Sequence, residues 1–176
     1  MAGAAEVLRR QWHDSGDRLG RRLDGLTDAE FFREPVPSCW TVRPHASSPG
    51  RWEIDYDWPV PEPPPVTTIA WRLVHLANGN WIYWEHAFGP GQRMFPDLVI
   101  PGSADAARGY WDDSRRPISS WLDQVTDEEL GEMRPSHLGA PRSAGDVMMI
   151  LIDEQVHHGA EIGVLRDLYR SPQRRT

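Results

Sequence analysis

The chain has 176 residues and a formal net charge of −7, and 39% of its residues are hydrophobic. This is the composition of a soluble globular protein that can bury a core, so we expect one domain over residues 1–176. The net negative charge argues against a nucleic-acid-binding protein, whose footprint is a basic patch. No apolar run approaches the length of a membrane span, so we expect neither nucleic acid nor a membrane as a partner.

The cysteine content and the N-terminal stretch indicate in which cellular compartment the protein works. Cys39 is the single cysteine, which excludes an internal disulfide and favours a reducing environment. The N-terminal stretch lacks the apolar segment of a secretory signal peptide. We therefore expect a cytoplasmic protein.

Four stretches show the hydrophobic period of 3.6 residues that is typical of helices. They are residues 2–26, 66–88, 103–125 and 143–170. Thr67 or Thr68 can cap the second helix and Ser143 the fourth, and Pro172 would end the fourth. Pro117 is expected to kink or split the third. Four long helices predict an all-α four-helix bundle.

Shorter elements are expected between these helices. Thr27–Glu30 and Thr126–Glu129 have the pattern of capping boxes, so each should begin a short helical turn. Residues 92–101 are predicted to be a connector, and Met133–Arg142 a loop that leads to the last helix.

The segment Pro35–Pro65, between the first and second long helices, has no helical period and is rich in proline. Trp40, Trp52 and Trp58 lie in it, and their large apolar surfaces favour cover by the rest of the protein. We expect an irregular loop packed over one end of the bundle. Two roles remain open for it: closing the core or walling a pocket.

The last helix carries an unusual polar pair on its apolar face. Seven residues share that face on a helical wheel: Val147, Leu151, Glu154, His158, Ile162, Leu165 and Tyr169. Glu154 and His158 are one turn apart, and a carboxylate that faces a core needs a partner. The pair could ligate a metal ion, or it could form a buried hydrogen bond between helices. His157 points away from this face, and His75 by itself is typical of a hydrogen-bonded core histidine.

A second stripe on the same helix has the spacing of a helix-packing seam. It consists of Met149, Ile152, Val156, Gly159 and Gly163. Glycines destabilise helices, and the close approach of another backbone is a usual reason for them. The partner could be a neighbouring helix of the same bundle or a second copy in a homodimer.

Taken together, three segments resemble the DinB-like superfamily of four-helix bundles. They are Thr68–Ala77, the residues Trp81, Trp84 and Phe88–Gly89, and Glu154–Gly159 with Leu165 and Arg166. Within that superfamily, the sequence is most similar to an actinobacterial branch of mycothiol-dependent transferases and maleylpyruvate isomerases. Members bind a divalent metal through one histidine of the second helix and two residues of the last, and this branch has Glu in place of one histidine.

The resemblance implies His75, Glu154 and His158 as the metal ligands. Two imidazoles and one carboxylate suit zinc with one open position, and nickel, manganese or iron could use the same donors. The expected activity is a thiol-dependent S-transferase or isomerase that uses a small thiol such as mycothiol and an electrophilic substrate. No residue matches a thiol-binding position, and His86 and His157 are weak choices for a general base. The alternative is a non-catalytic, stress-associated bundle that acts through self-association.

Overall fold

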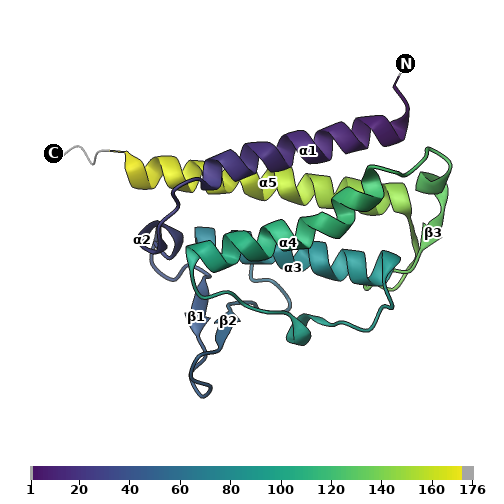
Figure 1. Cartoon of the computed structure of the whole chain (residues 1–176). Helices are drawn as coiled ribbons and strands as arrows, with labels where there is room; N and C mark the ends of the chain where they lie inside the picture. The colour runs from purple at the N-terminus through teal and green to yellow at the C-terminus, as the bar shows by residue number, and fades with distance from the viewer. Residues whose placement is uncertain (1, 172–176) are drawn as a thin grey trace.

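The computed structural model describes residues 2–171, and four long helices dominate it (Figure 1). These are α1 (Ala4–Leu23), α3 (Ile69–Phe88), α4 (Ala104–Leu122) and α5 (Ala144–Arg170). The short helices are α2 (Asp28–Phe31), η1 (Phe95–Asp97) and η2 (Glu129–Gly131). Two antiparallel pairs of short strands are also present: β1 (Val42–Pro44) with β2 (Trp52–Ile54), and β3 (Met133–Arg134) with β4 (Arg142–Ser143). The predicted all-α four-helix bundle is confirmed.

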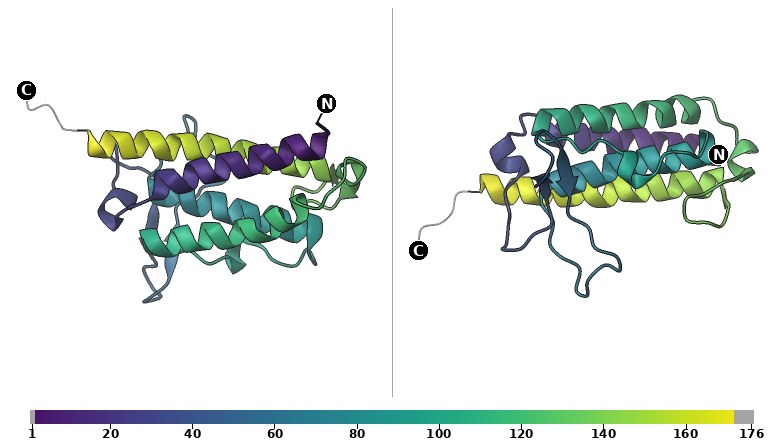
Figure 2. Two further views of the ribbon diagram at one scale, coloured as in Figure 1. Left: turned by 45° about the horizontal axis from the view of Figure 1, so that its top comes forward. Right: turned by 90° about the horizontal axis from the view of Figure 1, so that it is seen from below.

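The four long helices form a bundle in which α1 and α3 lie at opposite corners. Both α1 and α3 contact α4 and α5. Helices α1 and α5 run in one direction, and α3 and α4 run in the other (Figures 1 and 2). Because α3 and α4 are parallel, the connector between them returns along the length of the bundle. The antiparallel pair α3 and α5 carries the residues of the candidate site.

The predicted caps of the two site helices are observed. The Thr68 hydroxyl accepts a hydrogen bond from the Trp71 amide at 3.2 Å, and Ser143 accepts one from the Asp146 amide at 3.0 Å. Helix α3 begins three residues later than predicted, because Thr67 forms a parallel bridge with Trp40 instead. Pro172, the predicted stop of the last helix, lies outside the described residues.

The sequence predicts that Pro117 either kinks or splits the third helix, and the split is not observed. Helix α4 continues through Pro117 to Leu122, and Figure 1 shows it bending along its length. The C-terminal end of the first helix also differs from the prediction. Helix α1 ends at Leu23 rather than Leu26, and Gly25 follows with a φ of 65°, a left-handed conformation that glycine adopts without strain.

The two predicted capping boxes behave differently. In the second, the Thr126 amide donates to the Glu129 carboxylate at 2.8 Å and the Glu129 amide donates back to the Thr126 hydroxyl at 3.3 Å. In the first, the Glu30 amide bonds the Thr27 hydroxyl, but the Glu30 carboxylate pairs with Arg166 of α5 at 2.8 Å. Both charged side chains are almost completely buried. A long-range ion pair thus replaces half of the expected local motif.

The segment Pro35–Pro65 is more regular than predicted, because it contains the β1–β2 hairpin. Trp52 of β2 stacks on Phe32 with ring centroids 5.5 Å apart, and Val42 is buried in the core beneath. Trp58 contradicts the expectation of cover, since it is 84% exposed. The predicted loop Met133–Arg142 likewise contains strands, the β3–β4 pair.

The two glycines of the predicted seam on α5 face α1, whereas Met149 and Val156 of the same seam are exposed. A Cβ atom added at Gly159 would lie 3.7 Å from the Leu19 side chain, and one added at Gly163 would lie 3.2 Å from the Arg22 guanidinium. The Arg22 side chain also donates a hydrogen bond to the Gly163 carbonyl at 2.6 Å. Both glycines therefore have a packing partner within the same bundle.

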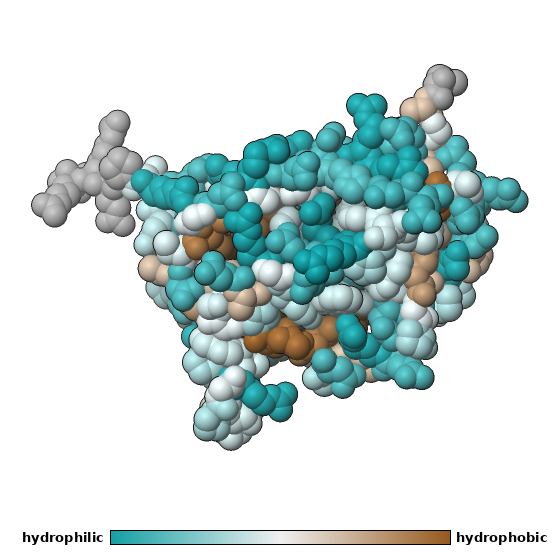
Figure 3. All heavy atoms as spheres, in the orientation of Figure 1, coloured by the Kyte–Doolittle hydropathy of each residue, from teal (hydrophilic) through white to brown (hydrophobic). Residues whose placement is uncertain are grey.

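The surface is predominantly polar on the face shown in Figure 3, where an apolar patch lies below α4, over the connector from α3. Phe95 and Val99 of this connector are more than half exposed. Among the helices in the described part of the chain, none is long and apolar enough to cross a membrane.

Candidate metal centre

Helix α3 contributes one imidazole to the candidate site. His75 lies between the bundle interior and the surface, and its ring stacks on Trp71, one turn earlier, with centroids 4.5 Å apart and planes inclined by 12°. The indole Nε1–H of Trp71 donates to the Asp55 carbonyl at 2.7 Å. Trp71 is thus held in place, and it restricts the orientation of His75.

Helix α5 contributes the carboxylate and the second imidazole. The Oε2 atom of Glu154 lies 3.2 Å from Nε2 of His158 and 3.4 Å from Nε2 of His75. The two imidazole planes are nearly perpendicular, at 86°. One ligand atom from each of the three residues lies within 4.8 Å of the other two. The structure therefore brings together the three residues that the resemblance implied.

A second interaction, at the other ring nitrogen, orients His158. Nδ1 of His158 lies 2.7 Å from Oε2 of Glu161, and Glu161 also pairs with the Arg72 guanidinium. Arg72 also lies 3.3 Å from this Nδ1 atom, but the shorter contact with Glu161, which can only accept when ionised, assigns the proton to Nδ1. Nε2 of a neutral His158 then presents its lone pair toward Glu154, as a metal-ligating histidine requires.

The charges at the site favour an anionic Glu154. The adjacent imidazoles of His158 and His75 hold the pKa of Glu154 well below its usual range, although burial opposes them. Burial lowers the pKa of Arg72, and Glu161 counteracts this effect. Burial, with a contribution from the charge of Glu154, raises the pKa of Tyr83, which lies two turns beyond His75 on α3. Tyr83 therefore stays a neutral phenol near the site.

The donor set fits a divalent metal. Around a tetrahedral zinc ion with nitrogen and oxygen ligands at about 2.0–2.1 Å, neighbouring ligand atoms lie about 3.3 Å apart. The two nitrogen–oxygen distances at Glu154, 3.2 and 3.4 Å, match this spacing. Charge-assisted hydrogen bonds are shorter, typically about 2.7–2.9 Å. The spacing thus favours the metal interpretation of the Glu154–His158 pair over a direct hydrogen bond.

A neighbouring cluster does not fit a metal as well. Nε2 of His157 lies 3.3 Å from Oε1 of Glu161, and His158 completes a group of three potential ligands. However, Arg72 already neutralises Glu161, and the ring of His158 can offer this cluster only its protonated nitrogen. His157 is exposed, as the sequence predicted.

The Pro35–Pro65 segment places aromatic side chains next to Trp71, which stacks on His75. Trp40 lies 5.9 Å from Trp71 and 5.6 Å from Tyr56, measured between ring centroids. This row leads to His75 through Trp71. The segment therefore covers the core, which is one of the two roles that the sequence left open, and its role in walling a pocket stays a prediction.

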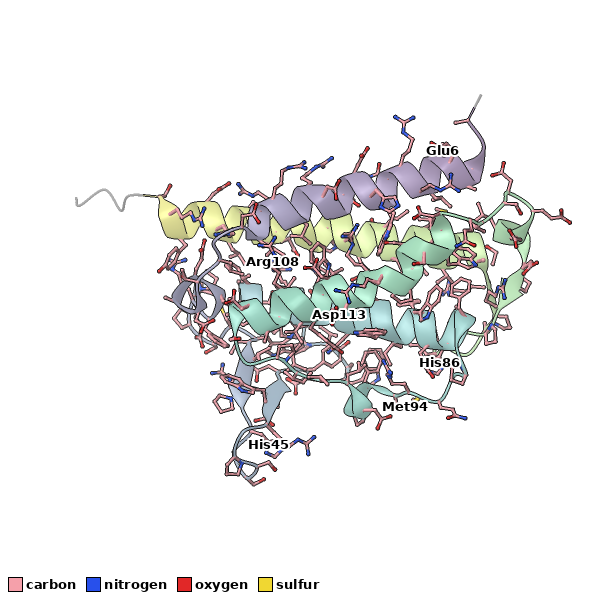
Figure 4. The ribbon with its side chains drawn as sticks, viewed as in Figure 1. Glu6, His45, His86, Met94, Arg108 and Asp113 are labelled. Carbon is pink, nitrogen blue, oxygen red and sulfur yellow. The ribbon has the colours of Figure 1, made fainter. Side chains whose placement is uncertain are left out.

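Other histidines lie elsewhere. Figure 4 shows His86 at the C-terminal end of α3 and His45 on the β1–β2 hairpin. Nε2 of His86 lies 3.0 Å from the Arg93 carbonyl, so His86 joins α3 to its connector. His137, on the β3–β4 loop, packs edge-on against Tyr83 with ring centroids 4.5 Å apart.

Two hollows lie away from the triad. One, of about 420 Å³, is lined by Trp84, Pro117, Ser120, Trp121, Gln124, Val125 and Glu129. The other, of about 290 Å³, lies between α1 and α4 and is lined by Gly16, Asp17, Gly20, Arg21, Asp24, Arg108, Trp111, Asp112 and Arg115. Neither hollow is lined by a residue of the triad.

Sequence reasoning did not find Arg72, Trp71, Tyr83 or Glu161 as parts of this site. A signal existed for Glu161, because it follows His158 by three residues and so shares a helical face with it. Arg72 and Trp71 likewise lie three and four residues before His75. Their roles depend on contacts between α3 and α5, which helical spacing alone does not specify.

The fold and the triad define a four-helix bundle with a candidate divalent-metal centre between two antiparallel helices. Residues 11–162 match the DinB superfamily, and the chain belongs to it. A solved DinB-like protein from Bacillus cereus is similar, with a TM-score of 0.63, 17% identity and coverage of 93% of this chain and 91% of that one. A conserved protein from Enterococcus faecalis has a TM-score of 0.59 at 15% identity, covering 96% and 98%. No curated protein matches the chain.

Proposed function

We propose that the protein binds one divalent metal, most simply zinc, through His75, Glu154 and His158, and uses it in thiol-dependent S-transfer or isomerisation. The observation that carries the metal proposal is the spacing of 3.2 and 3.4 Å between one Glu154 oxygen and the two imidazole nitrogens. Three protein ligands leave a position for an exogenous group, which is the pattern of catalytic rather than structural zinc sites.

The residues around the triad would support this role. Glu161 and Arg72 fix the tautomer and the direction of His158, and Trp71 holds the plane of His75. When bound, the metal would lower the pKa of a coordinated thiol and so supply a thiolate nucleophile at neutral pH. Trp40 and Tyr56 would shield one side of the approach from water.

The thiol is proposed to be a low-molecular-weight one such as mycothiol. Support for mycothiol comes from Glu154, which has the place of the carboxylate in the mycothiol-using branch that the sequence resembles. Nickel is the second choice for the metal, because imidazole and carboxylate ligands suit it as well.

One observation favours a second function. Both hollows lie away from the triad, as expected of a bundle that binds metal without processing a substrate there. In that case the protein would be a non-catalytic, stress-associated bundle acting through self-association. The homodimer remains a prediction, and Gly159 and Gly163 no longer motivate it because they pack against α1.

Two measurements test the proposal. Elemental analysis of protein purified without added metal should give about one zinc or nickel per chain. The cobalt-substituted protein should then develop a sulfur-to-metal charge-transfer band when a small thiol is added. Metal binding without this band would favour the non-catalytic function, and a protein that binds no metal at all would refute both the metal and the thiol parts.

A further inference from the structure

Gly79 occupies an unfavourable position, in the middle of the well-buried helix α3. Glycine destabilises a helix interior relative to alanine, so a mid-helix glycine calls for a packing reason. For two other helical glycines the reason is visible. A Cβ atom at Gly16 would overlap the Arg115 guanidinium, and one at Gly163 would crowd Arg22.

No such neighbour exists at Gly79. A Cβ atom added there would find nothing within 4 Å among the described residues. The position is nevertheless only partly exposed, whereas Gly109 of α4 is both exposed and free of neighbours among the same residues. Gly79 therefore leaves open space beside α3 that the described part of the protein does not fill.

This open space lies on the face of α3 that carries His75. Gly79 follows His75 by four residues and precedes Tyr83 by four, so all three share one face of α3. His75 on this face reaches Glu154 of α5. A side chain at Gly79 would thus extend into the space next to the ligand that His75 offers.

We propose that Gly79 keeps this space clear for the carbon skeleton of a small thiol whose sulfur approaches the position between His75, Glu154 and His158. This inference rests on the thiol function proposed above and adds the residue that admits the ligand. Tyr83, one turn further on, is the next residue on this face of α3. The size of the residue at position 79 then determines which thiols can approach.

The test compares Gly79→Leu with Gly109→Leu in the cobalt-substituted full chain. Both glycines are helical, and a Cβ atom added at either meets open space, so both variants should fold. Addition of 2-mercaptoethanol is followed by the near-ultraviolet charge-transfer band, and cobalt content is measured separately. Gly79→Leu should bind cobalt stoichiometrically but lower the affinity for the thiol at least tenfold. Gly109→Leu should behave like the wild type.

The other outcomes distinguish a failure of this inference from a failure of the proposed thiol function. Wild-type affinity for the thiol in Gly79→Leu would overturn this inference and leave the thiol function standing. Absence of the band in the wild type would overturn the thiol function, and this inference with it. If Gly79→Leu fails to fold, the smaller Gly79→Ala is measured instead, and an unchanged thiol affinity in that variant would overturn this inference.

Discussion

Nδ1 of His158 lies 2.7 Å from a carboxylate oxygen of Glu161, one turn further along α5. The same carboxylate pairs with Arg72 of α3, so one side chain both joins the two site helices and orients a candidate ligand. Partners of this kind fix the tautomer of a metal-binding histidine.

Replacing Glu161 tests this relationship. Glu161→Ala should lower metal affinity by about 10–100-fold, the range observed for such supporting residues. Glu161→Gln should lose less, because its carbonyl can still accept the Nδ1–H bond. Affinity is measured by competition with a chelator, and Asp153→Ala, at an exposed acidic residue on the same helix, is the control. Equal losses of metal affinity in all three variants would show that affinity depends only on the net charge of the protein.

The ligand assignment makes a separate prediction. Glu154→Ala and His158→Ala should abolish stoichiometric metal binding, while His157→Ala should retain it because His157 is exposed and lies off the ligand face. Elemental analysis after dialysis gives the metal content. Loss of metal from all three variants would contradict the assignment of the ligand face.

The glycine seam predicts an effect on stability. Leucine at Gly159 and Gly163 would push against Leu19 and Arg22 of α1, and overpacking of this kind typically costs about 1–3 kcal/mol per site. Urea denaturation measures the loss, with Gly109→Leu as the control. If instead the double variant is a stable monomer and the wild type a dimer by light scattering, the seam is an interface between copies.

Removing one partner of the buried ion pair between Glu30 and Arg166 should destabilise the protein strongly. Two Glu30 oxygens accept from the Arg166 guanidinium at 2.8 and 3.1 Å. Glu30→Ala leaves the Arg166 charge buried without its carboxylate partner, which typically costs about 3–5 kcal/mol. Chemical denaturation should show this loss, whereas Glu34→Ala, on the exposed surface, should change little. A loss below about 1 kcal/mol would mean that water reaches Arg166.

The raised pKa of Tyr110 predicts that the free energy of unfolding falls at alkaline pH. Burial raises its pKa to about 12, and its hydroxyl donates to the Asn78 side chain at 3.1 Å. The folded-state pKa of Tyr110 exceeds the reference value of about 10. The contribution of its neutral hydroxyl to the free energy of unfolding is therefore complete below about pH 10. It is lost as the pH rises from about 10 to 12, with a slope of at most about 1.4 kcal/mol per pH unit.

The comparison with Tyr110→Phe isolates this group. The wild type should lose its advantage in the free energy of unfolding over the variant within that pH window, as measured by denaturant titrations at each pH. Parallel curves for the two proteins would show that Tyr110 ionises as readily in the folded state as in the unfolded one.

The sequence by itself determined those features that depend on residues close together in the chain. Ser143 and Thr68 act as caps, and Thr126 and Glu129 form their box, because each bond spans three residues. Glu154 and His158 share a face because helical geometry places residues four apart side by side. The same periodicity was enough to predict four long helices and, with the family resemblance, the three candidate ligands.

Only the tertiary structure decided which partners meet across the bundle. Glu30 could have closed its local capping box, but its carboxylate pairs with Arg166, 136 residues away. Trp58 is exposed while Trp52 finds a place on Phe32, although both lie in the same proline-rich segment. Local propensity cannot distinguish such alternatives, because the free energy that separates them comes from packing and desolvation between distant elements. For the same reason, the contact between Glu161 and Arg72 could not be predicted from the sequence, because it depends on the packing of α3 against α5.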